Sequence, residues 1–94
     1  MTFKLKFDTR ALKEWNKLDA VVREQFKKKL GERLEQPVVY SSKVSGAENC
    51  YKIKLKAVGY RLVYQLIGDE LIVLVLAVGK RERNSVYKIA LNRI

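Results

Sequence analysis

Histidine is missing from this chain of 94 residues, and cysteine, proline, tryptophan and methionine each occur once. Without histidine the protein has no imidazole base, no imidazole metal ligand and no Ser-His catalytic triad. The single cysteine, Cys50, forms no disulfide within the chain, which suits a reducing compartment such as the cytoplasm. We interpret Cys50, at the start of a predicted strand, as a packing residue rather than a reactive one.

Acidic residues are also scarce, since 10 of them stand against 20 lysines and arginines and leave a net charge of +10. An excess of this size predicts a polyanionic partner, either nucleic acid or an acidic protein. The few acidic residues are scattered along the chain and form no ligand cluster. We therefore expect no metal and no other cofactor.

Long apolar runs are absent as well. The longest, residues 71–78, is far shorter than the ~20 residues that a transmembrane helix needs, and the N-terminus lacks the apolar core of a signal peptide. We expect a cytoplasmic protein with no membrane partner. With 48% hydrophobic residues, the chain is expected to fold as a single domain, residues 1–94.

The chain begins with a predicted strand and a first helix. Residues 3–7 alternate between apolar and charged side chains with a period of two, which is typical of a strand. Asp8 or Thr9 is expected to cap the helix that follows, because a side-chain oxygen there accepts from the free N–H groups. The apolar residues of this helix recur at helical spacing and are Ala11, Leu12, Trp15 and Leu18.

A second helix is predicted to begin at the cap residue Asp19 and to end before Pro37. Its apolar residues step by four and are Val22, Phe26, Leu30 and Leu34. On its exposed side we expect Glu24 to pair with Lys28. The short connection between the two helices predicts a helical hairpin.

The second half of the chain predicts strands at 51–56, 60–67 and 71–78, after a loop at 38–49, and a closing helix at 86–94. The fold class is therefore α+β. We expect a small β-αα-βββ-α domain, in which a mostly antiparallel four-stranded sheet packs on an N-terminal helical hairpin and carries a C-terminal helix.

Strand alternation places Lys52, Lys54 and Lys56 on one face of the first hairpin. A two-residue turn at 58–59 brings Arg61 to the same face, opposite Lys56. The same register places Lys54 opposite Val63 and Lys52 opposite Gln65. The other face of this hairpin is apolar and is expected to cover the helices.

The last strand is open to two registers, because a slip of one residue exchanges its faces. A three-residue loop at 68–70 pairs Arg61 with Ala77 and places Val73, Val75, Ala77, Gly79 and Arg81 on the basic face. A two-residue loop reverses this assignment. Side-chain size favours the first register, since Ile72, Leu74, Leu76 and Val78 are the bulkier set for a core. The basic face then holds a hollow edged by cations, which predicts a phosphate site.

Each basic residue also has an ordinary structural interpretation. A solvated lysine stripe is common, and edge lysines prevent strands from aggregating, so both interpretations of Lys56 stay open. Tyr87, at the start of the last helix, is either a substrate contact or a packing residue. The residues that we expect to attract RNA, rather than to react, are Lys27, Lys28, Lys56, Lys80 and Arg83.

Three segments, CYKIKL, GYRLVY and VGKRERNSVY, resemble the RelE toxins of bacterial toxin–antitoxin pairs, and FDTRALKEWNKLD and VREQFKKKL extend the resemblance over nearly the whole chain. The resemblance implies an endoribonuclease that cuts mRNA in the A site of the 70S ribosome, beside its 16S rRNA, and so inhibits translation. It also implies neutralisation by a RelB-like antitoxin, and binding to operator DNA only through the toxin–antitoxin complex.

Transferred position by position, the catalytic side chains of the family correspond to Lys52, Lys54, Arg61, Arg81 and Tyr87. One position departs from the family pattern: close relatives carry an arginine where this chain has Ser45, which removes one phosphate or RNA contact. The resemblance also favours the three-residue loop, because that register places Arg81 on the lysine face.

RNA can be cut by its own 2′-hydroxyl, which attacks the adjacent phosphorus and leaves a 2′,3′-cyclic phosphate. Without histidine a neutral lysine is the candidate base, but its ordinary pKa of about 10.4 is a handicap. A cation about 7 Å away, at an effective dielectric near 20, lowers that pKa by less than about two units. We therefore rank charge stabilisation by Lys52, Arg61 and Arg81 above base catalysis by Lys54.

Two other functions fit the same sequence. The first is a non-catalytic basic module that binds RNA or an acidic protein, for which salt-dependent binding without a cleaved product is diagnostic. The second is a toxin of the same fold that acts on DNA gyrase. A protein inhibitor of gyrase has no use for a hollow that binds phosphate, so the cluster of cations favours the nuclease.

Overall fold

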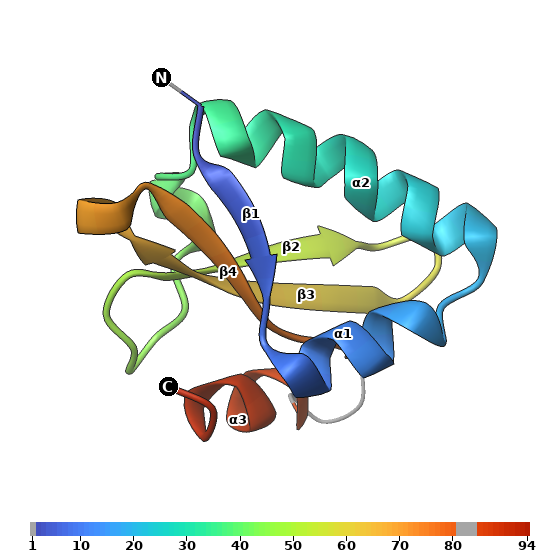
Figure 1. The fold of residues 1–94 in the computed structure, drawn as a ribbon. Helices are drawn as coiled ribbons and strands as arrows, with labels where there is room; N and C mark the ends of the chain where they lie inside the picture. The colour runs from blue at the N-terminus through green and yellow to red at the C-terminus, as the bar shows by residue number, and fades with distance from the viewer. Residues whose placement is uncertain (1, 81–84) are drawn as a thin grey trace.

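The computed structural model describes residues 2–80 and 85–94. Over these residues the elements follow the order β1 (Lys4–Phe7), α1 (Thr9–Asn16), α2 (Ala20–Glu35), β2 (Cys50–Leu55), β3 (Tyr60–Ile67), β4 (Ile72–Lys80) and α3 (Ser85–Leu91) (Figure 1). The predicted order β-αα-βββ-α is confirmed. None of these helices is both long and apolar enough to cross a bilayer.

The four strands form one sheet in the order β1-β4-β3-β2, in which only β1 runs parallel to its neighbour and the other pairs are antiparallel. Figure 1 shows α2 and α3 on opposite sides of this sheet. The expected α+β architecture, with a mostly antiparallel sheet on a helical hairpin, is therefore confirmed.

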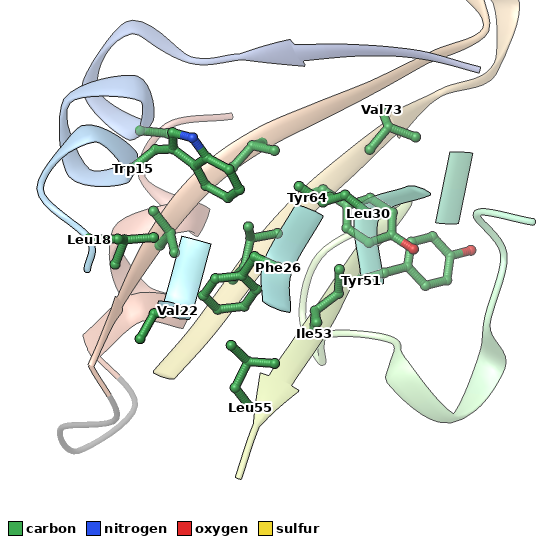
Figure 2. Close-up of a cluster of buried hydrophobic side chains, with 14 residues drawn as sticks. Trp15, Leu18, Val22, Phe26, Leu30, Tyr51, Ile53, Leu55, Tyr64 and Val73 are labelled. Carbon is green, nitrogen blue, oxygen red and sulfur yellow. The ribbon is translucent and has the colours of Figure 1, made fainter. Parts of the chain in front are cut away.

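The larger core lies between the sheet and the hairpin formed by α1 and α2 (Figure 2). Trp15 and Phe26 from the helices pack there against strand residues such as Ile53, Leu62 and Tyr64. A smaller core lies on the opposite face of the sheet, under α3, and contains Cys50, Val63, Leu76, Ala77, Val86 and Ala90. The single cysteine is fully buried in this smaller core, as its interpretation as a packing residue requires.

Both helices of the hairpin begin where the sequence predicts. Asp8 is the N-cap of α1, and its carboxylate accepts from the backbone N–H of Arg10 at 2.9 Å. Asp19 occupies the same position before α2.

The predicted pair between Glu24 and Lys28 is wrong, because Glu24 pairs with Lys27 at 3.2 Å instead. Three-residue and four-residue spacings both bring side chains together on a helix, so the pattern alone does not choose between them. The closing helix ends at Leu91, earlier than predicted.

The predicted register of the first hairpin is wrong by two residues. Lys54 lies opposite Arg61 and Lys52 opposite Val63, because the turn has four residues, 56–59, instead of two. Gly59 closes this turn with a φ of 70°, and its N–H donates to the carbonyl of Leu55 at 2.9 Å. A shift of two residues preserves the faces of a strand, so the lysine face remains as predicted.

The predicted register of β4 is wrong for a different reason. Val63 pairs with Ala77 but the next residue, Tyr64, pairs with Val75, so Leu76 is an extra residue in β4 and forms a β-bulge. Beyond the bulge, Ala77 lies on the basic face and Val78 on the hairpin side, as predicted.

Before the bulge the predicted faces of β4 are exchanged. Val73 and Val75 belong to the core of the helical hairpin, whereas Leu74 and Leu76 pack toward α3. The predicted pairing of Arg61 with Ala77 is also wrong, because Arg61 lies opposite Gly79. The expected three-residue loop is a four-residue connection that ends at Leu71, whose φ is 54°. Side-chain size misled the prediction, because the bulky residues of β4 fill a second core.

Candidate active site

A hollow of about 480 Å³ opens on the α3 side of the sheet, where β2, β3, the segment before β2 and α3 meet. Four of the five side chains predicted to be catalytic line it, namely Lys52, Lys54, Arg61 and Tyr87. The fifth, Arg81, lies outside the described residues. The other residues of the lining are Lys43, Val44, Ser45, Lys88 and Leu91.

The cations of this hollow are placed by strand alternation. Lys52 and Lys54 are two residues apart on β2 and point to one face, while Ile53 between them is buried in the opposite core. Arg61 joins them from β3 because it pairs directly with Lys54. Two of the strongest candidate residues therefore lie opposite each other in one antiparallel pair.

Tyr87 closes the hollow from α3 and contacts the cations with both its hydroxyl and its ring. Arg61 Nη1 donates to the Tyr87 hydroxyl at 3.1 Å, and the Arg61 guanidinium lies 5.3 Å from the ring centroid. Lys52 Nζ lies 5.6 Å from the same centroid. These are cation–π distances, so Tyr87 holds the two cations close together despite their like charge.

The helix that carries Tyr87 is fixed by the second core. Val86 and Ala90, on either side of Tyr87, are buried with Val63, Leu76 and Ala77 of the sheet. Gly79 lies under this helix, where a Cβ would be in ordinary van der Waals contact with Val86 Cγ2 at 3.5 Å. The half-buried Tyr87 thus points from a packed helix onto the basic face.

The electrostatics of the hollow favour an anion. Among the described residues, its lining carries five cationic side chains, Lys43, Lys52, Lys54, Arg61 and Lys88, and no carboxylate. Cations fixed around a concave surface raise the local potential and stabilise charge that develops on a phosphate. Beside this face Cys50 is buried, and burial raises the pKa of its thiol, which makes it a poor nucleophile.

The residues expected to bind RNA lie at different places. Lys56 is exposed beyond the end of β2, and Lys80 is exposed at the end of β4. Lys27 and Lys28 are exposed on α2, the helix that covers the opposite face of the sheet from Tyr87. Arg83 falls outside the residues that the structure describes. Ser45, the departure from the family pattern, is exposed and lines the hollow.

Sequence patterns did not reveal Arg33, which ties α2 to the edge of the sheet. Its Nη1 donates to the Tyr64 hydroxyl at 3.0 Å and to the Lys52 carbonyl at 3.4 Å, and its Nη2 donates to Ser42 Oγ at 3.3 Å. The Tyr64 hydroxyl in turn donates to the carbonyl of Pro37 at 2.6 Å. The partners come from separate segments, and no local spacing marks such a network.

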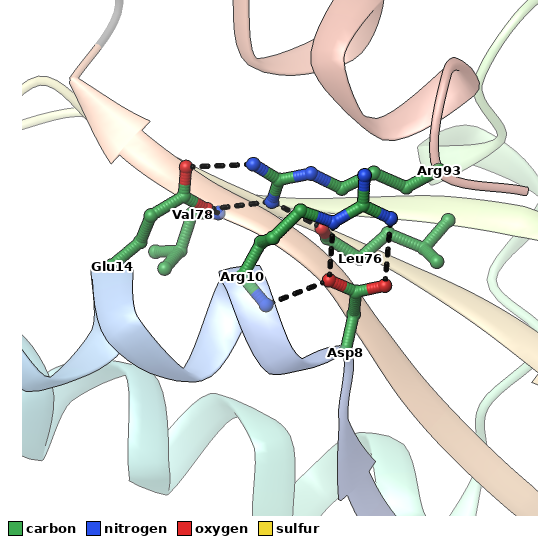
Figure 3. A network of polar contacts seen from close by, with 6 residues as sticks. All are labelled: Asp8, Arg10, Glu14, Leu76, Val78 and Arg93. Atoms are coloured by element: carbon green, nitrogen blue, oxygen red, sulfur yellow. Dashed lines mark hydrogen bonds and ion pairs between the residues drawn. The ribbon is translucent and has the colours of Figure 1, made fainter.

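Glu14 was likewise not predicted to have a role. Its carboxylate accepts from Arg93 at 2.9 and 3.2 Å and from the backbone N–H of Val78 at 3.3 Å (Figure 3). Arg93 Nη1 also donates to the carbonyl of Leu76 at 2.8 Å. The pairing of β1 with β4 ends at Val75, so this ion pair satisfies β4 backbone groups beyond the end of β1 and connects α1, β4 and the segment after α3.

Comparison with known proteins places these observations in a family. A family model described as "ParE toxin of type II toxin-antitoxin system, parDE" matches residues 5–85. The chain is 56% identical over 94 residues to the mRNA interferase toxin RelE of Escherichia coli K12, covering 100% of this chain and 99% of that toxin.

Solved structures of RelE toxins are similar to this chain as well. A free E. coli RelE variant with two arginines replaced by alanine superposes with a TM-score of 0.92 at 54% identity, covering 100% of this chain and 99% of that one. The toxin in the intact E. coli RelBE toxin–antitoxin complex gives a TM-score of 0.83 at 57% identity, over 86% of this chain and 99% of that one.

Proposed function

We propose that this chain, which belongs to the RelE family of toxins of type II toxin–antitoxin systems, is an endoribonuclease that cleaves messenger RNA and so inhibits translation. The observation that carries the proposal is the convergence of Lys52, Lys54, Arg61 and Tyr87 on one hollow in a chain that matches an mRNA interferase over its full length. Residues 1–94 act as a single RelE-like domain, in the cytoplasm and without a cofactor.

In the proposed reaction the 2′-hydroxyl of the message attacks the adjacent phosphorus. The bond to the 5′-oxygen of the next nucleotide breaks and that oxygen takes a proton from water, which leaves a 2′,3′-cyclic phosphate and a 5′-hydroxyl. Lys52 and Arg61 stabilise the charge that develops on the phosphate. Lys54 is the candidate acceptor of the 2′-hydroxyl proton, and Tyr87 orients the 2′-hydroxyl or stacks on a base.

Arg81 is assigned to this site by the family resemblance alone. Its proposed part is to stabilise the charge on the leaving 5′-oxygen, because a guanidinium stays protonated in proteins and is a weak acid. Mutating Arg81 to Ala tests this assignment independently of the geometry.

The limited acid–base chemistry of the site suggests that the ribosome contributes to catalysis. Holding the message in line for attack supplies several kcal/mol of the barrier through positioning alone. We therefore propose that cleavage occurs in the ribosomal A site. Toeprint mapping on a defined message should show efficient cutting of ribosome-bound mRNA and negligible cutting of free RNA, and equal rates on the two substrates would contradict the proposal.

A separate experiment tests whether Arg61, rather than Lys56, belongs to the active hollow. Arg61→Ala should reduce the single-turnover rate far more than Lys56→Ala, because Arg61 contacts Tyr87 inside the hollow and Lys56 lies outside its lining. Lys13→Ala is the matched control, since it removes an exposed lysine from α1, in the helical hairpin on the other side of the sheet. If Lys56→Ala is the most damaging of the three, the assignment is wrong.

The proposed partner is a RelB-like antitoxin, and operator DNA is bound only through the complex with it. The support is the likeness of the chain to RelE in the RelBE complex. The same toeprint experiment separates the alternatives: a gyrase toxin inhibits DNA supercoiling and leaves ribosome-bound mRNA intact, and a non-catalytic module binds RNA without a cleaved product.

A further inference from the structure

A second hollow lies along β2 and shares two lysines with the first. It has a volume of about 290 Å³ and is lined by Arg33, Ser41, Ser42, Lys52, Lys54 and Lys56. Four of these six side chains are cationic and two are hydroxyls, and none of the residues 2–80 and 85–94 contributes a carboxylate to the lining. Since Lys52 and Lys54 line both hollows, the two form one continuous basic surface.

Arg33 is held in place before any ligand arrives. Its guanidinium donates to the Tyr64 hydroxyl, the Lys52 carbonyl and Ser42 Oγ, and it lies 5.8 Å from the centroid of the Tyr64 ring. The side chain is half-buried. A cation fixed in this way loses little conformational entropy when it binds an anion, so Arg33 is a preorganised phosphate contact.

Tyr40 stands directly before the two serines of this hollow and is 80% exposed. It begins the 3-10 turn Tyr40–Ser42, which is closed by backbone bonds from Ser42 to Val39 at 2.9 Å and from Lys43 to Tyr40 at 3.3 Å. A tyrosine this exposed contributes little to the core. Tyr40 is the residue before Ser41, which lines the cationic hollow, and single-strand binding proteins combine cations along the backbone with aromatic rings under the bases.

The lysines of β2 also follow a regular path. Lys52 and Lys54 are two residues apart on β2, about 6.6 Å on an extended strand, which is close to the separation of neighbouring phosphates in an extended single strand, and Lys56 follows in the turn after β2. A strand of RNA that enters the first hollow can therefore continue along β2 into the second.

We propose that the second hollow binds a nucleotide of single-stranded RNA next to the one that is cut. Arg33, Lys54 and Lys56 contact its phosphate, and its base stacks on Tyr40. The identity of the ligand rests on the proposed nuclease function. An acidic peptide would use the same cations, but the exposed ring of Tyr40, next in sequence to Ser41 of the lining, favours a ligand that carries a base.

The test uses 2′-O-methyl RNA, which lacks the attacking hydroxyl, in lengths of three and six nucleotides, with binding followed by fluorescence anisotropy at low salt. The wild-type protein should bind the six-nucleotide RNA more tightly than the three-nucleotide RNA. Tyr40→Ala should weaken binding of the longer RNA about tenfold and leave the shorter one unchanged. Tyr40→Phe should bind like the wild type, because the ring is kept.

Val21→Ala is the control, since it trims a side chain that is 67% exposed on α2; thermal unfolding should show that none of these variants is destabilised. Equal binding of the longer RNA by Tyr40→Ala and wild type, or no binding by the wild type, would overturn the subsite. So would a Tyr40→Ala defect confined to an acidic peptide such as poly-glutamate. A protein that binds RNA through Tyr40 but cleaves no ribosome-bound message keeps the subsite and contradicts the nuclease function.

Discussion

Glu14 and Arg93 are 79 residues apart in the sequence and form a two-bond ion pair at 2.9 and 3.2 Å. Both side chains also bind the backbone of β4, Glu14 at Val78 and Arg93 at Leu76. The pair therefore satisfies part of β4 beyond the end of β1 and fastens the segment after α3 to α1. Because α3 carries Tyr87, this contact also contributes to the shape of the candidate active site.

Arg93→Ala should lower the free energy of unfolding by about 2 kcal/mol. The Arg93 side chain is only 11% exposed, so its loss removes both charged donors of the Glu14 carboxylate, which keeps only the Val78 N–H, and the guanidinium donor of the Leu76 carbonyl. Urea unfolding followed by circular dichroism measures the change.

Arg10→Ala is the matched control, because Arg10 also pairs with a carboxylate, that of Asp8, but is 59% exposed. Ion pairs in solvent contribute less than about 1 kcal/mol. Arg10→Ala should therefore cost clearly less than Arg93→Ala, and equal losses would mean that the contacts of Arg93 with β4 are unimportant.

Tyr87→Phe should retain part of the cleavage activity, whereas Tyr87→Ala should lose it almost completely. The phenylalanine ring still faces Lys52 and Arg61 but no longer accepts the hydrogen bond from Arg61. We expect a rate loss of about tenfold for Tyr87→Phe, equivalent to one hydrogen bond. Single-turnover cleavage of ribosome-bound mRNA measures both; equal losses would show that the hydroxyl, rather than the ring, carries the effect.

Two glycine substitutions should change stability in opposite directions. Gly31 lies inside α2 with open space at its Cβ position, so Gly31→Ala should stabilise the protein by about 0.5–1 kcal/mol. Gly59 has a φ of +70° in the first hairpin turn, so Gly59→Ala should destabilise it by about 1 kcal/mol. Thermal unfolding tests the pair, and a gain in stability from Gly59→Ala would contradict the described turn.

Stability should fall at alkaline pH in part because of Cys50. Burial raises the pKa of its thiol in the folded protein, so the unfolded chain releases this proton at a lower pH than the folded one. The contribution of Cys50 is complete below the ordinary thiol pKa and is lost as the pH rises through the folded pKa. The free energy of unfolding, measured by urea titration at several pH values, should decline less steeply above the ordinary thiol pKa in Cys50→Ala.

Burial raises the pKa of Tyr64 as well, so Cys50→Ala should keep a shallower alkaline decline. An identical decline in wild type and Cys50→Ala would contradict the assignment to the thiol. In the native protein the buried thiol should also react slowly with iodoacetamide near neutral pH.

Local patterns correctly predicted most of the elements and the shared face of two candidate site residues. Alternation placed Lys52 and Lys54 on one face, and the helical spacing identified Trp15 and Phe26 as core residues. These patterns depend on neighbours in the chain, so they can be recognised from the sequence without a structure. The transfer of Tyr87 to the site depended on the family resemblance, because its contact with Arg61 spans 26 residues.

The registers of the hairpins were not predictable in the same way. The turn at 56–59 is two residues longer than expected, and the bulge at Leu76 exchanges the faces of β4. Both depend on what the strands pack against. Leu74 and Leu76 lie toward α3 because a second core exists there, and the alternation of side chains in β4 does not indicate that core.

The sequence by itself determined the order of the elements, the basic face of β2 and the absence of an imidazole base, because these depend on composition and on spacing within single segments. The tertiary structure decided which cations meet. It set Arg61 opposite Lys54, brought Tyr87 onto Arg61 and Lys52, and placed Arg33 beside Lys52. Such contacts join segments through packing and hydrogen bonds, whose partners are chosen by the whole fold rather than by neighbours along the chain.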